Sequence, residues 1–278
     1  MGRRHITELA VGGLTLRGTA KGGVETSLMV PELRVIFDMG AVLPGAFGFD
    51  RVLASHGHAD HLAGLHYFVS QRHLNDRRPA QVHIPAEIEA PLRRIFEAWR
   101  EIEGFDLTVD LHATAPGDRF QVGEGLFATA MRTVHRVPSL AYCIERETQK
   151  LAPRFHGADR ETIVAAKRAG ESVTVPHRTP QLCVTGDTQI EFLEAHPEML
   201  KVRVLVHEVT AWDERRTVEE IRRWGHTHVE EMIAMSERFE GEALVLVHRS
   251  LRHSVEQARE IVARRFPASV RERVHVFA

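Results

Sequence analysis

The amino-acid sequence predicts a single α/β domain over residues 1–278, and three observations support this fold class. The chain has 278 residues, of which 43% are hydrophobic, so it can bury a large core. Short apolar runs that end in polar loops alternate with segments of helical periodicity, as expected of a mixed α/β fold. Several of these runs end in histidine or aspartate, which places ligand-type side chains on loops held by a rigid base.

The N-terminal part predicts a β-meander. Residues 6–16 alternate loosely between apolar and polar side chains, and apolar runs follow at 26–30 and 34–37 with a turn at 31–33. The glycine-containing stretch 18–23 is expected to interrupt these strands. Asp38 ends the last of them, where it could hydrogen-bond a metal-ligating histidine. A carboxylate bonded to amides of the next loop would explain Asp38 equally well.

A dense run of ligand-type side chains follows the next predicted strand, 52–54. The sequence Ser55-His56-Gly57-His58-Ala59-Asp60-His61 holds three imidazoles and a carboxylate within six residues. Zinc and related metals take such ligands, and His-x-His on a tight turn lets two side chains converge on one ion. A solvated histidine-rich turn is the alternative, but such tracts rarely carry an embedded aspartate. The spacing therefore predicts a metal site, with Asp60 and His61 facing a second ion.

Helices and strands then alternate along the chain. We expect a helix from residue 62 to about 72, a strand at 82–85 and further strands at 105–108, 119–122 and 126–133. A helix over 87–101 has an apolar face that is predicted to lie in the core and consists of Ile88, Leu92, Ile95, Phe96 and Trp99. Later strands are expected at 182–184, 202–206 and 243–247, and later helices at 229–239 and 255–266.

Three candidate ligands follow predicted strands in this second part. They are His135, Asp187 and His248. A lone histidine at a strand end is more often structural, so each is a weak signal by itself. The strand at 202–206 also leads into His207-Glu208-Val209-Thr210, and Gly225-His226-Thr227 precedes the helix at 229–239.

Together these motifs resemble the metallo-β-lactamase superfamily of binuclear hydrolases, whose pattern adds a later His, a later Asp and a C-terminal His to H-x-H-x-D-H. The boxes around Glu208 and His226, with the run 246–253, resemble ribonuclease Z, the endonuclease that trims precursor tRNA 3′ ends. Residues 18–27 and 35–40 are most similar to its short plant-type form. The matches extend from about residue 14 to the end of the chain.

The resemblance implies a fold and a set of metal ligands. The fold is the four-layer αβ/βα metallo-β-lactamase sandwich, with two mixed sheets flanked by helices. Two divalent ions are implied; zinc is expected, and manganese, iron or cobalt would suit the same ligands. One ion is assigned to His56, His58 and His135, the other to Asp60, His61 and His248, with Asp187 bridging the two.

The resemblance also implies a reaction, in which a hydroxide held between the metals attacks phosphorus and releases the 3′ trailer of precursor tRNA. Asp60 would accept a proton from the hydroxide, and His226, oriented by Glu208, would protonate the leaving 3′-oxygen. A buried ion pair that ties strand to helix is the alternative for Glu208 and His226. Ser250 and Arg252 could bind the scissile phosphate, and a surface role explains them equally well. A homodimer is also implied.

Two departures from the family bear on substrate contacts. His253 stands where the family usually has tyrosine, which puts substrate contacts there in doubt. The stretch from His135 to Asp187 leaves no room for the long Gly- and Pro-rich arm of many bacterial forms, an arm that plant-type forms also lack. Within this stretch we expect a short basic insert over 146–180 that contacts the RNA backbone. Between Arg146 and Arg178 it has seven Lys/Arg against four acids, a local net charge of +3.

Composition constrains partner and compartment. The formal net charge is −2, so no overall basic field indicates nucleic acid, which weakens an RNA-binding function without removing it. Both cysteines, Cys143 and Cys183, lie in apolar runs and predict buried thiols in a reducing compartment. Residues 1–5 are not followed by the apolar stretch of a signal peptide, and no long apolar segment predicts a membrane span. We therefore expect a soluble, cytoplasmic protein.

Two other functions remain open. A hydrolase of small substrates, such as a cyclic or simple phosphodiesterase or a glyoxalase II-like thioesterase, fits the near-neutral charge and the missing arm. It would turn over bis(p-nitrophenyl) phosphate or a glutathione thioester without cutting tRNA. A non-catalytic metal-containing RNA-binding protein is the second alternative, and the presence of Asp60, Glu208 and His226 argues against it.

Overall fold

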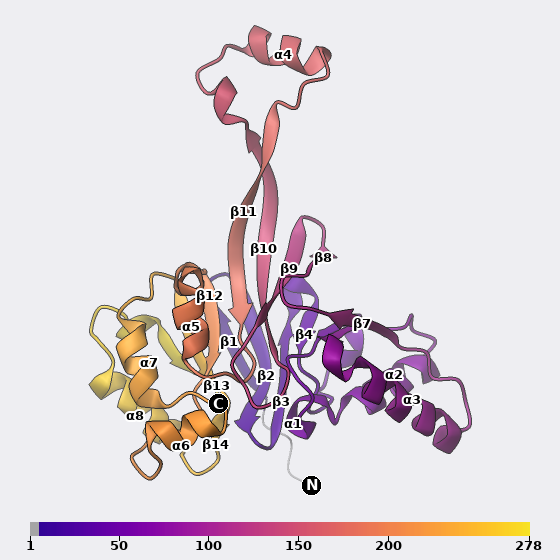
Figure 1. The fold of residues 1–278 in the computed structure, drawn as a ribbon, viewed down its shortest axis with the longest axis vertical. Coiled ribbons are helices and arrows are strands. Elements are labelled where there is room, and N and C mark those ends of the chain that lie inside the picture. Colours follow the sequence, from indigo (N-terminus) through magenta and orange to yellow (C-terminus); the bar gives the residue numbers. More distant parts are fainter. Residues whose placement is uncertain (1–5) are drawn as a thin grey trace.

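Two mixed β-sheets face each other across the main hydrophobic core, in a computed structural model that describes residues 6–278 (Figure 1). The predicted domain also includes residues 1–5, which lie outside the described part. Side chains from both sheets fill the space between them, among them Leu28 and Phe37 from the first sheet and Tyr142 and Val245 from the second. Burial of these side chains fixes the spacing of the sheets.

The first sheet has the order β1-β2-β3-β4-β5-β6-β7, with the short β14 paired to β2. Its first four strands are antiparallel to their neighbours, whereas β4 to β7 are parallel. The strands are β1 (Thr7–Val11), β2 (Leu14–Gly22), β3 (Glu25–Val30), β4 (Val35–Phe37), β5 (Arg51–Leu53), β6 (Gln81–Pro85), β7 (Asp110–Thr114) and β14 (Arg249–Ser250).

The prediction that residues 18–23 interrupt the meander was wrong, because β2 runs on to Gly22. The backbone of β3 lies so close to Gly18 that a Cβ there would be 2.0 Å from the carbonyl oxygen of Ser27. Glycine at this position is therefore required by the close approach of two strands, and it does not mark a strand end.

The second sheet has the order β15-β13-β12-β11-β10-β9-β8. Strands β8 to β11 pair antiparallel, and β11, β12, β13 and β15 pair parallel. The predicted strand at 105–108 was wrong; the following strand begins at Asp110 and joins the first sheet. The strands are β8 (Arg119–Gly123), β9 (Leu126–Arg132), β10 (Leu140–Leu151), β11 (Thr174–Val184), β12 (Val204–Glu208), β13 (Ala243–Val247) and β15 (Val274–Val276).

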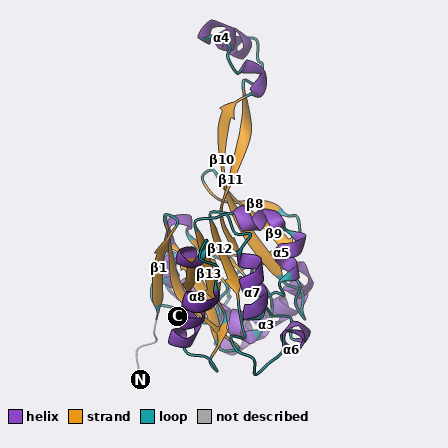
Figure 2. Ribbon diagram, turned by 90° about the vertical axis from the view of Figure 1, so that its left-hand side faces the viewer, coloured by secondary structure: helices purple, strands orange, loops and turns teal. Residues whose placement is uncertain are grey.

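Helices cover the outer faces of both sheets and complete the predicted four-layer sandwich (Figures 1 and 2). One core cluster joins the first sheet to the helices α2 and α3, and another joins the second sheet to α5, α7 and α8. The helices are α1 (Ala59–Leu62), α2 (Leu65–Leu74), α3 (Glu89–Glu103), α4 (Arg160–Arg168), α5 (Glu191–Ala195), α6 (Val218–Arg223), α7 (Val229–Ser236) and α8 (Val255–Arg265).

The apolar face predicted for α3 was wrong at one position. Phe96 is buried, but Ile95 is 50% exposed. Within the described residues no helix is long and apolar enough to cross a membrane.

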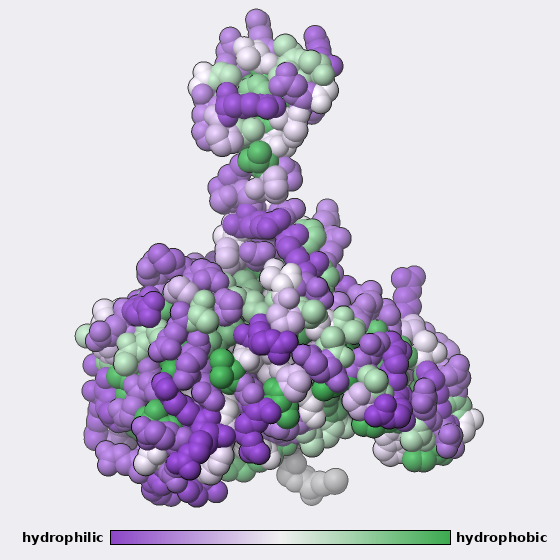
Figure 3. Space-filling model, viewed as in Figure 1, coloured by the Kyte–Doolittle hydropathy of each residue, from purple (hydrophilic) through white to green (hydrophobic). Residues whose placement is uncertain are grey.

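An arm projects from the body of the molecule (Figures 1 and 2). It is the outer part of the β10–β11 hairpin with α4 at its tip, and Asp159 caps α4 by accepting a hydrogen bond from the Thr162 amide at 2.8 Å. Burial along β10 ends at Ile144, where a bulge follows, and the surface beyond it is mainly hydrophilic (Figure 3). The stretch 146–180, which we expected to be a short insert, therefore forms an extended arm that is not rich in glycine and proline.

The two cysteines are neighbours on the sheet. Cys143 of β10 lies opposite Cys183 of β11, and both are buried free thiols, as predicted. Burial raises the pKa of Cys143 to about 12, so this thiol is neutral at physiological pH.

Candidate metal centre

The ends of several strands meet at one edge of the sandwich, and all seven predicted metal ligands lie there. The loop after β5 and the start of α1 supply four of them from the first sheet, and loops after β9, β11 and β13 supply three from the second sheet. Those seven residues are His56, His58, Asp60, His61, His135, Asp187 and His248. Loops on rigid strands can thus hold side chains from distant parts of the chain in one place.

The seven side chains form two groups. His56, His58, His135 and Asp187 make up the first, and Asp60, His61 and His248 the second. Within each group the potential ligand atoms lie within 4.8 Å of one another. Three or four such atoms around one point could hold a divalent cation.

Asp187 lies between the two groups. Its Oδ2 is 3.6 Å from Nε2 of His56, while its Oδ1 is 3.4 Å from Nε2 of His61 and 3.3 Å from Nε2 of His248. One carboxylate oxygen therefore faces each group, which is the arrangement needed to bridge two cations.

Gly186 places Asp187 in this position. Its φ is +60°, a left-handed conformation that favours glycine, and a Cβ there would lie 2.4 Å from Cβ of Ser55. The turn that aims Asp187 therefore packs directly on the loop that carries His56.

Asp38 holds the first-sheet side of the centre. Its Oδ2 is 2.8 Å from Nδ1 of His61, and its Oδ1 accepts a hydrogen bond from the Ser55 amide at 2.7 Å. Oγ of Ser55 lies 2.9 Å from Nδ1 of His56. Asp38 therefore bonds a histidine of the candidate centre, as one interpretation of the sequence predicted, and an amide of the loop after β5 instead of the loop that directly follows it.

The second-sheet histidines are held in the same way. Nδ1 of His135 donates to the carbonyl oxygen of Gly225 at 2.8 Å, and Nδ1 of His248 lies 3.0 Å from Oγ1 of Thr210. Oγ1 of Thr210 in turn donates to Oε2 of Glu208 at 2.9 Å, so this hydroxyl accepts from His248. Contacts at Nδ1 orient both rings so that each Nε2 faces the centre.

Glu208 and His226 form a pair beside the centre. Oε1 of Glu208, at the end of β12, is 2.7 Å from Nδ1 of His226, and Glu208 is fully buried. Burial alone would lower the pKa of His226, but the charge and hydrogen bond of Glu208 outweigh it and raise that pKa to about 9. This imidazole therefore carries a proton that its Nε2 can donate.

The side chains present fit two divalent cations. Asp187 is buried, and its Oδ1 has no hydrogen-bond partner among the described residues. Nε2 of His56 is 2.9 Å from Nδ1 of His58, and Nε2 of His61 is 3.4 Å from Nε2 of His248, so ring nitrogens converge within each group. Because unpaired buried polar groups are costly, a cation in each group would stabilise the site.

In the first group, the pKa values agree with neutral imidazoles around one ionised carboxylate. Burial lowers the pKa of His56, His58 and His135. Burial opposes ionisation of Asp187, but the neighbouring histidines outweigh it and hold its pKa well below the usual range. Neutral imidazole and ionised carboxylate are the forms that bind metal.

Ser250 and Arg252 lie on the wall of a pocket of about 590 Å³ that opens onto the centre, together with His58, His226 and His248. Among the described residues, neither side chain is hydrogen-bonded to one of the seven candidate ligands. His253, the departure from the family, is buried behind this wall; its Nε2 accepts a hydrogen bond from the Trp212 amide at 3.4 Å.

Sequence reasoning missed two residues that line the same pocket, Arg136 and Trp224. Arg136 directly follows His135, and only Gly225 separates Trp224 from His226. Neither has a spacing that indicates a role. Thr210 stood within a recognised box, yet its link between Glu208 and His248 depends on the fold.

The comparisons with known proteins agree with this geometry. A family model described as the beta-lactamase superfamily domain matches residues 41–249. The chain is 32% identical over 257 residues to tRNase Z TRZ1 of Arabidopsis thaliana, covering 92% of each chain. It resembles the solved structures of the metallo-beta-lactamase fold protein YhfI from Bacillus subtilis, with a TM-score of 0.64, and of the short form of human tRNase Z, with a TM-score of 0.58. Both structures are 16% identical to this chain and match 98% of it; the match covers 96% of the first structure and 95% of the second.

Replacing Glu208 by glutamine should flatten the pH dependence of stability of the metal-free protein. A His226 pKa raised from 6.5 to about 9 means that the pairing stabilises fully below pH 6.5 and is lost as pH rises towards 9. Thermal midpoints in chelator should therefore fall more steeply over this range for the wild type than for Glu208→Gln. Glu198→Gln, beside His196, is the control. Parallel profiles for wild type and Glu208→Gln would contradict the assignment.

Proposed function

We propose a function for this chain, which belongs to the β-lactamase superfamily and within it to the tRNase Z family. It is a metal-dependent endoribonuclease that removes the 3′ trailer of precursor tRNA. The observation that carries the proposal is the Glu208–His226 pair beside a centre for two metals. Hydrolysis of a phosphodiester inside an RNA expels a ribose 3′-oxygen, a poor leaving group that needs a proton. A protonated imidazole at the edge of the centre supplies it.

Each residue of the pair has one role in this proposal. His226 donates the proton on Nε2 to the leaving 3′-oxygen. Glu208 accepts from Nδ1 and keeps the imidazole protonated and oriented. Amides of Thr188 and Thr227 also bond Oε1 of Glu208, at 3.2 and 3.3 Å, so the carboxylate itself is held in place.

Asp60 is proposed as the base for the attacking water. Its Oδ2 accepts a hydrogen bond from the Gly23 amide at 3.0 Å and lies 3.5 Å from Nε2 of both His61 and His248. Burial opposes its ionisation, but the neighbouring imidazoles of His248 and His61 outweigh it and hold its pKa below the usual range. Two divalent ions, when bound, would lower the pKa of that water and neutralise charge on the phosphate.

The proposed ligands are those predicted from the sequence, and the proposed metal is zinc. Five imidazoles with two carboxylates suit zinc well, and manganese or iron remain compatible with the same set. His56, His58 and His135 would hold one ion, Asp60, His61 and His248 the other, and Asp187 would contact both. Ser250 and Arg252, on the pocket wall, are proposed to contact the scissile phosphate.

The arm is proposed to bind the RNA backbone away from the cleavage point. β10 starts beside the centre, where the Leu140 amide donates to the Ser55 carbonyl oxygen, and its 12 residues span roughly 40 Å towards the tip. Two of the seven basic side chains between 146 and 178 pair with acids, Arg178 with Glu147 and Arg154 with Glu171. The others are exposed without an ion pair to a described residue: Arg146, Lys150, Arg160, Lys167 and Arg168. A substrate as large as tRNA can reach both places.

A cytoplasmic homodimer completes the proposal. The short plant-type resemblance and the buried free thiols Cys143 and Cys183 support it. The name of one relative specifies the chloroplast and the name of another specifies the nucleus. Membership of the family therefore does not determine the compartment.

The zinc-loaded protein should cut a 3′-extended precursor tRNA once, at the end of the acceptor stem. His226→Ala should lower kcat on this RNA by about 10² to 10⁴, because the leaving 3′-oxygen loses its acid. The kcat of the same variant should fall much less on bis(p-nitrophenyl) phosphate, because its leaving group, p-nitrophenolate, leaves without a proton. Asp60→Ala should fail on both substrates, since it removes a base and a proposed ligand.

Two matched variants control for general damage, His196→Ala on the C-terminal side of α5 and Asp50→Ala before β5. Hydrolysis of the small diester without tRNA cleavage would contradict the tRNA assignment and favour the small-substrate hydrolase. Equal losses on both substrates in His226→Ala would contradict the role of His226.

Charge reversal at the arm tip should weaken tRNA binding and its salt dependence. Lys167→Glu with Arg168→Glu removes two proposed phosphate contacts, so the slope of log affinity against log salt should fall by about one per contact. Arg259→Glu with Arg264→Glu on α8 is the matched control. An unchanged slope in the arm variant would exclude the arm from RNA binding.

A further inference from the structure

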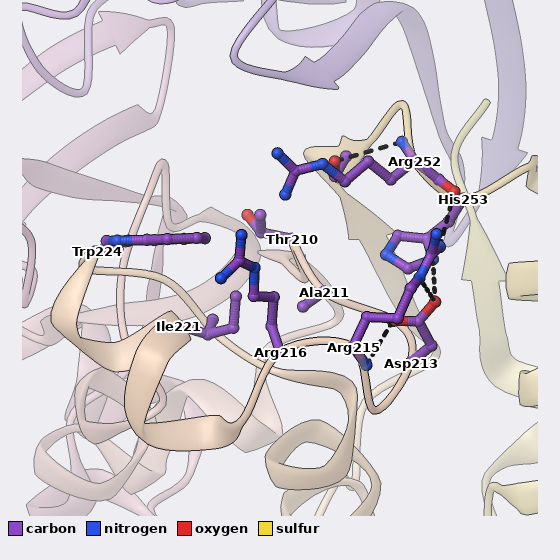
Figure 4. A pocket seen from close by; sticks show the side chains of 10 residues that line it. Thr210, Ala211, Asp213, Arg215, Arg216, Ile221, Trp224, Arg252 and His253 are labelled. Carbon is purple, nitrogen blue, oxygen red and sulfur yellow. Dashed lines mark hydrogen bonds and ion pairs between the residues drawn. The ribbon is translucent and has the colours of Figure 1, made fainter.

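A second pocket opens beside the one over the metal centre (Figure 4). Its volume is about 380 Å³, and it shares four lining residues with the pocket of about 590 Å³ over the centre. These shared residues are Thr210, Trp224, Ser250 and Arg252. A substrate that lies on the centre can therefore continue into the second pocket without leaving the protein surface.

Trp224 forms one wall of this second pocket, and its ring is unusually accessible. The residue is 36% exposed, and in Figure 4 it lies across the pocket from Arg252, with Thr210 between them. The guanidinium carbon of Arg216 is 5.1 Å from the centroid of the ring. An accessible indole with an arginine beside it is a surface on which a nucleobase can stack.

The pocket also carries cationic groups. Arg215 pairs with Asp213 at 2.5 Å and Arg216 with Glu220 at 3.3 Å, so these two are held in place. Arg252 is exposed and pairs with no carboxylate among the described residues. Its guanidinium is therefore available to a phosphate at the opening between the two pockets.

Trp224 is fixed relative to His226 by a tight turn. The amides of Trp224 and His226 both donate to the carbonyl oxygen of Ile221, at 3.0 and 3.2 Å. Gly225 between them has φ +82°, and a Cβ there would lie 2.6 Å from Nδ1 of His135. The stacking surface and the proton donor of the proposed reaction are thus presented by one rigid turn.

We propose that the second pocket binds the nucleotide immediately 5′ of the scissile phosphate, with its base stacked on Trp224 and with Arg252 on the scissile phosphate itself. The inference rests on the proposed function, because His226 protonates the 3′-oxygen of this same nucleotide. The base and the leaving oxygen belong to one nucleoside, and only Gly225 separates Trp224 from His226 in the sequence. Stacking tolerates any base, so the pocket senses that a base is present and not which base it is.

The test is a cycle between Trp224 and the base of that nucleotide. Trp224→Ala should lower kcat/KM on 3′-extended tRNA about ten- to hundredfold, the range of one base–aromatic stack, while Trp224→Phe should stay within about threefold. An abasic site at the 5′ nucleotide should lower kcat/KM of the wild type by the same factor. It should cause almost no further decrease in Trp224→Ala. An abasic site at the 3′ nucleotide should cost both proteins equally.

The inference is overturned if the losses of kcat/KM caused by Trp224→Ala and by the 5′ abasic site multiply when the two changes are combined. It is also overturned if the effect of Trp224→Ala depends on the base of the 3′ nucleotide instead. Trp99, whose ring centroid is 3.8 Å from that of His66, does not line this pocket, so Trp99→Phe is the control for substitution of a tryptophan elsewhere in the protein. Its kcat/KM should match the wild type on all three RNAs.

A binding measurement separates this inference from the proposed function. An RNA with a non-cleavable methylene in place of the scissile 3′-oxygen and 2-aminopurine at the 5′ nucleotide should lose fluorescence on the wild type and keep it on Trp224→Ala. Equal signals from the two proteins would contradict the stacking pocket. A wild type that quenches 2-aminopurine yet leaves precursor tRNA uncut would contradict only the tRNA-processing function.

Discussion

The contact of one buried carboxylate with histidines from both sheets is the constraint on which the centre depends. Asp187 comes from the second sheet, and two of the imidazoles that face its oxygens, His56 and His61, come from the first. The two groups can share this residue only if the sheets are in register. Gly186 lets the Asp187 loop pack on Ser55, and the hydroxyl of Tyr142 donates to the carbonyl oxygen of Ala54 at 3.0 Å. Packing between the sheets thus sets the spacing of the proposed ligands.

Outward from Asp187, a second set of carboxylates decides which proton each imidazole carries. Asp38 bonds Nδ1 of His61 and leaves its Nε2 for a metal. Glu208 bonds Nδ1 of His226, whose Nε2 lies outside the two main groups and is proposed to keep its proton for the leaving group. The same type of contact is therefore proposed to serve metal binding at one position and acid catalysis at the other.

The sequence allowed prediction of the sandwich and of the residues at its edge, because strand ends and ligand spacing are local features. His135, Asp187 and His248 were each weak signals that gained meaning from their order after the His56–His61 run. The arm could not be predicted in the same way, since beyond Ile144 the side chains of β10 have no core to alternate against. The prediction for Ile95 failed because helical periodicity does not show which positions of α3 are covered by neighbouring elements, and Ile95 is exposed. Trp224 depends on a turn and on contacts from distant elements.

Metal content is the measurement that tests the central claim most directly. The account predicts two zinc ions per chain in the reconstituted protein by inductively coupled plasma mass spectrometry. It predicts at most one in Asp187→Asn, because an amide cannot place an anionic oxygen on each ion, and two in the control Asp213→Asn. One ion in the wild type, or two tightly held ions in Asp187→Asn, would contradict a centre built around a shared carboxylate.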